Sequence, residues 1–237
     1  MERARYGTGV FLKLNKRNCE TRIRLTPCGE DFTKVQMKID GIHNDFFLSG
    51  IMGSQFSSLL TAVYCLYEED DFAHWYFRRR NPQLKREYSD RRKDGNCSTR
   101  AEIHWDGEMY GYATLLLWRE SPSLNPPDAN TPDPVHISIC RRRSKSYTVD
   151  GRDLCYAVAK ACTEALKKYG FKGYLKSNSG HDLGDSIDIE KLLFIKAYAL
   201  GVLDARETVR IWEHPRGWMR ADASSFEKEI ELLLFDM

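Results

Sequence analysis

The sequence predicts an α+β fold, a largely antiparallel sheet packed against two to four helices, with the helices concentrated in the C-terminal third. Three observations predict it. Short β-prone segments separated by turn signals fill roughly the first 150 residues. Two amphipathic helical patterns follow, around Asp150–Tyr169 and Asp188–Val202. The chain has 237 residues, which suits one domain, so a single α+β domain over 1–237 is expected.

Alternation of polar and apolar residues predicts the first strands. Thr21–Leu25 and Lys34–Ile39 both alternate with a period of two, which buries one face of a strand and exposes the other to water. Asp40 and Gly41 follow, and both residue types tolerate the positive φ angles of a tight hairpin turn. Ile42–Ser49 is therefore the expected return strand.

The middle of the chain predicts one helix and a second hairpin. Ser54–Tyr67 carries apolar residues at spacings of three and four, which places them on one side of a helix. Thr99–Trp105 and Tyr110–Arg119 flank an Asp-Gly turn and form the expected hairpin. Val135–Cys140 then resumes the sheet.

Two segments are expected to be mobile surface loops. The first, 78–98, is rich in charged residues and poor in apolar ones. The second, 120–134, holds five of the eight prolines, so it cannot be a central strand or a helix interior.

The C-terminal helices carry their own start and stop signals. Asp150 and Asp188 are placed as N-terminal caps, and Gly170 and Gly201 as C-terminal stops. Cysteines 155 and 162 share one helix face, where thiols pack as small hydrophobic groups. A further helix is expected over 224–235, although 231–235 also fits a strand.

Composition excludes several classes of protein. The net charge of +2 gives no overall reason to expect a nucleic-acid partner. No apolar run is long enough to cross a bilayer or to serve as a signal peptide, and the seven cysteines include no C-x-x-C pair. We therefore expect a cytoplasmic protein with reduced thiols, no membrane contact, no cofactor and no metal.

Acidic and histidine residues form two weak candidates for chemistry. His104, Asp106 and Glu108 lie near one predicted turn, where general acid–base catalysis is the functional interpretation and ordinary turn residues the structural one. His181 and Asp185, with Asp188, have oxygen-rich spacing for a hard cation, or simply precede a helix cap. Neither set is taken as a catalytic or metal site, and an enzyme of unrecognised type stays as the last alternative.

The clearest candidate binding residues are aromatic and arginine side chains that adjoin one another. Such combinations are typical of interface hot spots. An acidic run just before them forms a second patch. The expected partner-binding residues are Trp75, Tyr76, Arg78, Arg79, Arg80, Glu68, Glu69, Asp70 and Asp71. The interpretation is a non-enzymatic protein that inhibits or sequesters a protein partner.

Nucleic-acid binding is the alternative function. The basic stretches 78–93 and 141–145 would supply the phosphate contacts, and binding would then weaken steeply as salt is raised. The structural interpretation of both stretches is solvated loops and strand ends.

One resemblance adds to this interpretation. A β-rich start leads to the helix Gln55–Ala62, a β-segment ends in Trp118 before the proline loop, and a later helix runs into Lys167–Tyr174. This order is similar to the immunity-type proteins that bacteria encode beside polymorphic toxins. The resemblance implies a non-enzymatic protein that binds one cognate toxin, and it assigns no specific residues.

Overall fold

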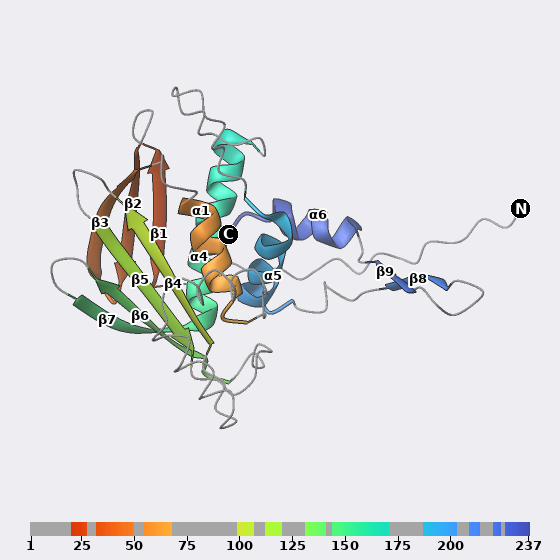
Figure 1. Cartoon of the computed structure of the whole chain (residues 1–237). Coiled ribbons are helices and arrows are strands. Elements are labelled where there is room, and N and C mark those ends of the chain that lie inside the picture. The colour runs from red at the N-terminus through yellow and green to blue at the C-terminus, as the bar shows by residue number, and fades with distance from the viewer. Residues whose placement is uncertain are drawn as a thin grey trace, which may run out of the picture.

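The α+β class is confirmed in a computed structural model of the chain (Figure 1). The structure describes residues 20–27, 32–49, 55–67, 99–106, 112–119, 131–140, 144–170, 187–202, 209–213, 220–223 and 226–237. The strands are β1 (Arg22–Pro27), β2 (Phe32–Ile39), β3 (Ile42–Ser49), β4 (Thr99–Asp106), β5 (Tyr112–Arg119), β6 (Pro134–Cys140), β7 (Ser144–Asp150), β8 (Val209–Glu213) and β9 (Arg220–Ala223). The helices are α1 (Gln55–Tyr64), α4 (Gly151–Tyr169), α5 (Ile189–Leu200) and α6 (Phe226–Leu234).

The N-terminal sheet has the order β1-β2-β3, with every pair antiparallel. Its β2–β3 turn is the predicted one, because Asp40 and Gly41 have φ angles of 50° and 77°. The alternation also holds: one face is buried and the other faces solvent. The buried face comprises Ile23, Leu25, Val35, Met37, Ile39, Asn44 and Phe46.

The second sheet has the order β4-β5-β6-β7 and corrects two sequence-based interpretations. Pro134 was placed in a surface loop, yet it begins the central strand β6. The first position of a strand tolerates proline, which lacks an N–H group. β7 was not predicted, because only Tyr147 and Val149 are apolar on its buried side. Lys145, assigned to a basic loop, lies in that strand.

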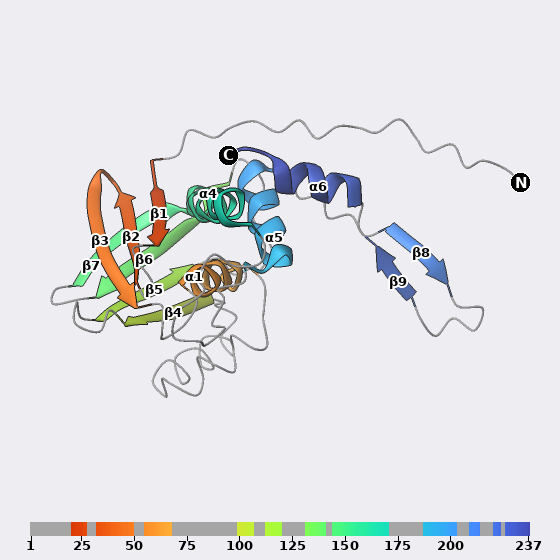
Figure 2. The ribbon, with the colours of Figure 1, turned by 90° about the horizontal axis from the view of Figure 1, so that it is seen from above.

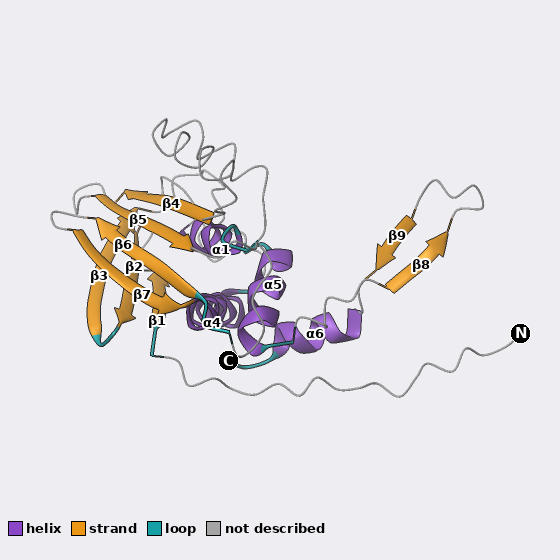
Figure 3. Cartoon of the chain, turned by 90° about the horizontal axis from the view of Figure 1, so that it is seen from below, coloured by secondary structure: helices purple, strands orange, loops and turns teal. Residues whose placement is uncertain are grey.

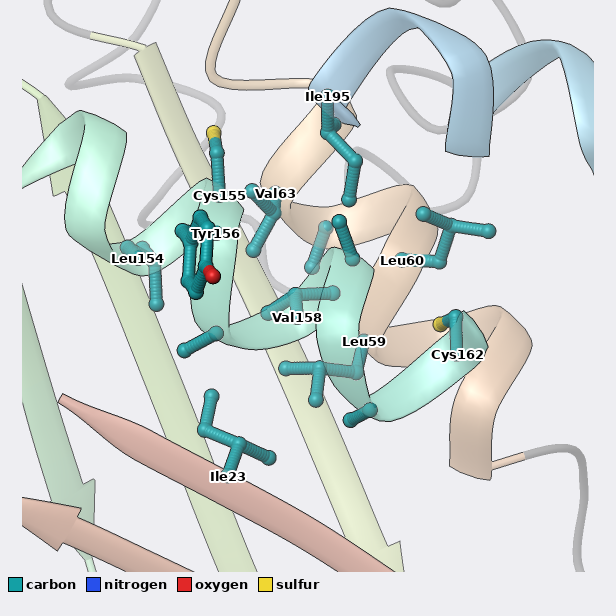
Figure 4. Packing of buried hydrophobic residues seen from close by; sticks show 14 of the residues in the cluster. Ile23, Leu59, Leu60, Val63, Leu154, Cys155, Tyr156, Val158, Cys162 and Ile195 are labelled. Carbon is teal, nitrogen blue, oxygen red and sulfur yellow. The ribbon is translucent and has the colours of Figure 1, made fainter. Parts of the chain in front are cut away.

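Helix α4 lies at the centre of the molecule, against α1, α5 and β1 (Figure 4). It begins as predicted, since the Asp150 carboxylate accepts hydrogen bonds from the backbone N–H groups of Arg152 and Asp153. Cys155 and Cys162 are buried, as expected. Burial extends almost around the helix, which is wider than the single apolar stripe that its sequence predicts.

The strands of the two larger sheets lie on one side of the molecule and the helices on the other (Figures 2 and 3). The inner faces of both sheets and the helices contribute to one hydrophobic cluster. The last element is the helix α6 rather than a strand. Within the described ranges, no helix has the length and apolar character to cross a bilayer.

Candidate functional site: a buried carboxylate and a basic sheet face

A cluster of buried polar side chains surrounds Asp133, directly before β6. Its carboxylate is paired with the Nε atom of Arg119 at 2.5 Å, and the Tyr67 and Tyr198 hydroxyls donate to its Oδ2 atom at 2.8 and 2.7 Å. These four side chains, the Asp133 network, come from the segment after α1, the end of β5, the loop before β6 and the last turn of α5. One carboxylate thus joins four parts of the chain.

Burial keeps the hydroxyl groups of this network protonated. It raises the pKa of Tyr67 and of Tyr198 well above the ordinary range, and hydrogen bonds to Asp133 act in the same direction. Burial likewise raises the pKa of the neighbouring Cys155 thiol, so this cysteine is not a reactive thiolate. Both carboxylate oxygens already have donors, and the side chains of Arg119 and Asp133 are 0% and 1% exposed. The network therefore stabilises the fold, and a substrate has no access to its carboxylate.

Gly151 shows how tightly the network is enclosed. Its backbone N–H donates to the Asp133 carbonyl oxygen at 2.7 Å at the start of α4. A Cβ atom at this position would overlap the Tyr67 hydroxyl and the Asp133 carboxylate. Only glycine fits at position 151, because there is no room for a side chain between α4 and the Asp133 network.

A second buried charge, Lys196 of α5, holds the end of α6. Its Nζ atom donates to the hydroxyl of Thr163 at 3.3 Å and to the carbonyl oxygens of Leu233 and Phe235 at 3.0 and 2.8 Å. Three acceptors match the three N–H donors of an ammonium group. Burial, with a smaller contribution from Lys167, lowers the pKa of Lys196 to about 8. This site is also structural, since it caps the carbonyl end of α6.

A group of basic side chains lies on the outer face of the N-terminal sheet. Four cations lie there on two neighbouring strands, Arg22 and Arg24 on β1 and Lys34 and Lys38 on β2, and we call them the basic face. Alternation explains the arrangement, because each cation is one or three positions from a residue of the buried face.

The register places two residues of the basic face in one line across the sheet with His43 of β3. Arg22 is paired with Lys38 and Lys38 with His43, one residue from each strand, and we call this line the basic row. Arg22 and His43 are exposed and Lys38 is half-buried. Among the residues described, no carboxylate forms an ion pair with a member of the basic row.

The opposite end of the same face has a different character. The Lys34 ammonium lies 3.3 Å from the Asp45 carboxylate and 5.9 Å from the centre of the Phe47 ring. Gln36 also donates to Asp45, at 3.4 Å. Phe47 is 40% exposed, one of few large apolar side chains in the described residues that reach solvent. The face thus combines an unneutralised cationic end with a neutral end that exposes an aromatic ring.

Most residues singled out from the sequence lie outside the part of the chain that the structure describes. The predicted partner-binding residues, all within 68–80, lie outside the described residues, as do Glu108, His181 and Asp185. His104 is opposite Thr114 in the β4–β5 register and Asp106 is opposite Tyr112. Asp188 caps α5 by accepting from the Lys191 backbone N–H at 3.2 Å, which is the structural interpretation of that residue.

Sequence reasoning missed the basic face, although its signal was present. The residues that alternate with the apolar ones in β1 and β2 are mostly basic, a pattern that predicts a cationic solvent face. The Asp133 network had no such signal, because Tyr67 and Tyr198 lie 66 and 65 residues from Asp133 in the chain. Comparison with other proteins adds no further constraint: no protein-family model, no curated protein and no solved structure matches this chain.

Proposed function

We propose that this protein is a non-enzymatic binding protein that inhibits or sequesters a protein partner, in the manner of the immunity-type proteins it resembles. One observation carries the proposal, the basic face with Phe47 at its edge. Cationic groups and an aromatic ring that are held on a rigid sheet form the kind of surface that protein interfaces use.

The buried chemistry of the fold agrees with a binding role. The groups with shifted pKa values, among them Tyr67 and Lys196, belong to closed networks that join helices and strands. No group of metal-ligating side chains occurs in the described part of the chain. The described cysteines, Cys65, Cys140, Cys155 and Cys162, are reduced thiols, in keeping with action in a reducing cytoplasm.

Affinity capture from a lysate of the native host tests this function. The tagged protein is incubated with nuclease-treated lysate at moderate salt, and the retained proteins are identified by mass spectrometry. The proposal expects one protein in stoichiometric amount, and expects the purified pair to form a complex in which that protein's activity is suppressed. Recovery that disappears after nuclease treatment would favour nucleic-acid binding instead. A purified pair that forms no complex would reject the proposal.

A further inference from the structure

We infer that the basic row, Arg22, Lys38 and His43, recognises a cluster of carboxylates on an acidic segment of the partner protein. This inference rests on the proposed function and names the chemistry of the partner's contact surface.

The first argument is the cost of the row in the free protein. Arg22 and Lys38 are direct cross-strand partners, and side chains so paired have Cβ atoms about 5 Å apart. Like charges in such a pair destabilise a sheet. No described carboxylate relieves this repulsion, while Lys34 on the same face has Asp45 beside it. Anions supplied by a partner would relieve this repulsion. The free energy that the repulsion costs the free sheet would then favour binding of the partner.

The second argument is spacing. Neighbouring strands lie about 4.8 Å apart, so a row across three strands spans roughly 10 Å. Alternate side chains of an extended segment lie about 6.7 Å apart. Two carboxylates of an acidic segment therefore fit along the row, and the planar guanidinium of Arg22 offers a two-pronged contact to one of them.

The third argument favours a protein over a nucleic acid. The Asp45 carboxylate lies in the next line of the same face, opposite Gln36, and pairs with Lys34, so this end of the face offers a continuous phosphate backbone little net positive charge. Phe47 beyond it offers apolar contact area, which suits the mixed surface of a protein. The net charge of the whole chain is only +2, which provides little general attraction for a polyanion.

The test uses a defined probe, a fluorescent peptide rich in Asp and Glu, with fluorescence anisotropy at low salt. The full-length wild type is expected to bind this peptide at least about tenfold more tightly than the same peptide with Asn and Gln in place of the acids. The double variant Arg22→Glu/Lys38→Glu is expected to lose this preference. The matched control is Lys160→Glu/Lys168→Glu, which makes the same charge change on α4 and is expected to keep the preference.

Each other outcome has a clear meaning. Equal binding by the wild type and the Arg22→Glu/Lys38→Glu variant, with both folded by circular dichroism, would overturn the inference. Tighter binding of an oligothymidylate of the same formal charge would overturn it in favour of a nucleic acid. If a partner captured from the lysate binds wild type and variant equally, the inference about the basic row is wrong and the proposed function stands. If no captured protein forms a complex, the proposed function itself fails.

Discussion

The carboxylate of Asp133 accepts from Tyr67, Tyr198 and Arg119, so its removal takes an acceptor away from three buried donors. Taking two charges out of water costs several kcal/mol per ion, and the pair with Arg119 offsets this cost only while both members are present. The stability of the fold therefore depends on both charged groups of this network.

Asp133→Asn is expected to lower the free energy of unfolding by about 3–5 kcal/mol, because it removes the carboxylate charge that pairs with the buried Arg119 guanidinium. Urea denaturation followed by circular dichroism measures the change. The double variant Asp133→Asn/Arg119→Met removes both charges, and its loss is expected to be smaller than the sum of the two single losses. A single variant within about 1 kcal/mol of wild type would show that the pair is not coupled as described.

Lys196 gives a prediction about pH. Its folded-state pKa of about 8 is below the ordinary value of 10.5, so between these pH values the unfolded chain holds a proton that the folded chain has lost. The contribution of Lys196 to the free energy of unfolding therefore rises with pH across that window, by about 3 kcal/mol in total.

The measurement compares wild type with Lys196→Met by urea denaturation at pH 7 and at pH 10. Subtraction is needed because Cys155, Tyr67 and Tyr198 have raised pKa values, which lower stability as pH rises above 9 in both proteins. The free energy of unfolding of the wild type is expected to rise, relative to that of Lys196→Met, between pH 7 and pH 10. A difference that stays constant would mean that Lys196 titrates as an exposed lysine.

At the scale of the elements, caps decide where the C-terminal helices begin. Asp188 has extended backbone angles and accepts from the Lys191 N–H, and the Lys191 ammonium lies 3.6 Å from the same carboxylate. Asp188→Ala is expected to cost about 1 kcal/mol of stability, whereas Asp188→Asn should cost only a few tenths, since asparagine caps equally well. Thermal or urea unfolding distinguishes the two. An equal loss in both variants would assign Asp188 a role that needs its charge.

The elements with clear local signals were predictable from the sequence. Period-two alternation and an Asp-Gly turn predicted the β1–β3 meander, and Asp and Gly punctuation predicted α4 and α5. β7 was missed because its solvent face is composed of serines and a threonine, beside a run of arginines that looks like a loop. The partners of Asp133 and Lys196 were not predictable, because they lie 14 to 66 residues away in the chain and meet only through tertiary packing.

At the scale of the whole molecule, basic and acidic residues are nearly equal in number. The chain has 36 basic and 34 acidic residues, yet the basic row has no described ion-pair partner. Its exposed charges lie on the β1–β3 sheet, and the hydrophobic cluster lies on that sheet's other face. A sheet supported in this way holds its side chains in fixed register, which is what recognition of a shaped acidic surface requires.

The most direct test is a capture experiment with wild type and Arg22→Glu/Lys38→Glu side by side, from nuclease-treated host lysate. Affinity for the purified captured protein is then measured as salt is raised. We expect the wild type to retain one protein in stoichiometric amount, and the variant to bind it at least about tenfold more weakly at low salt, with the gap narrowing as salt screens the charges. Equal affinity of the two proteins at every salt concentration would contradict a partner-binding role for the basic face.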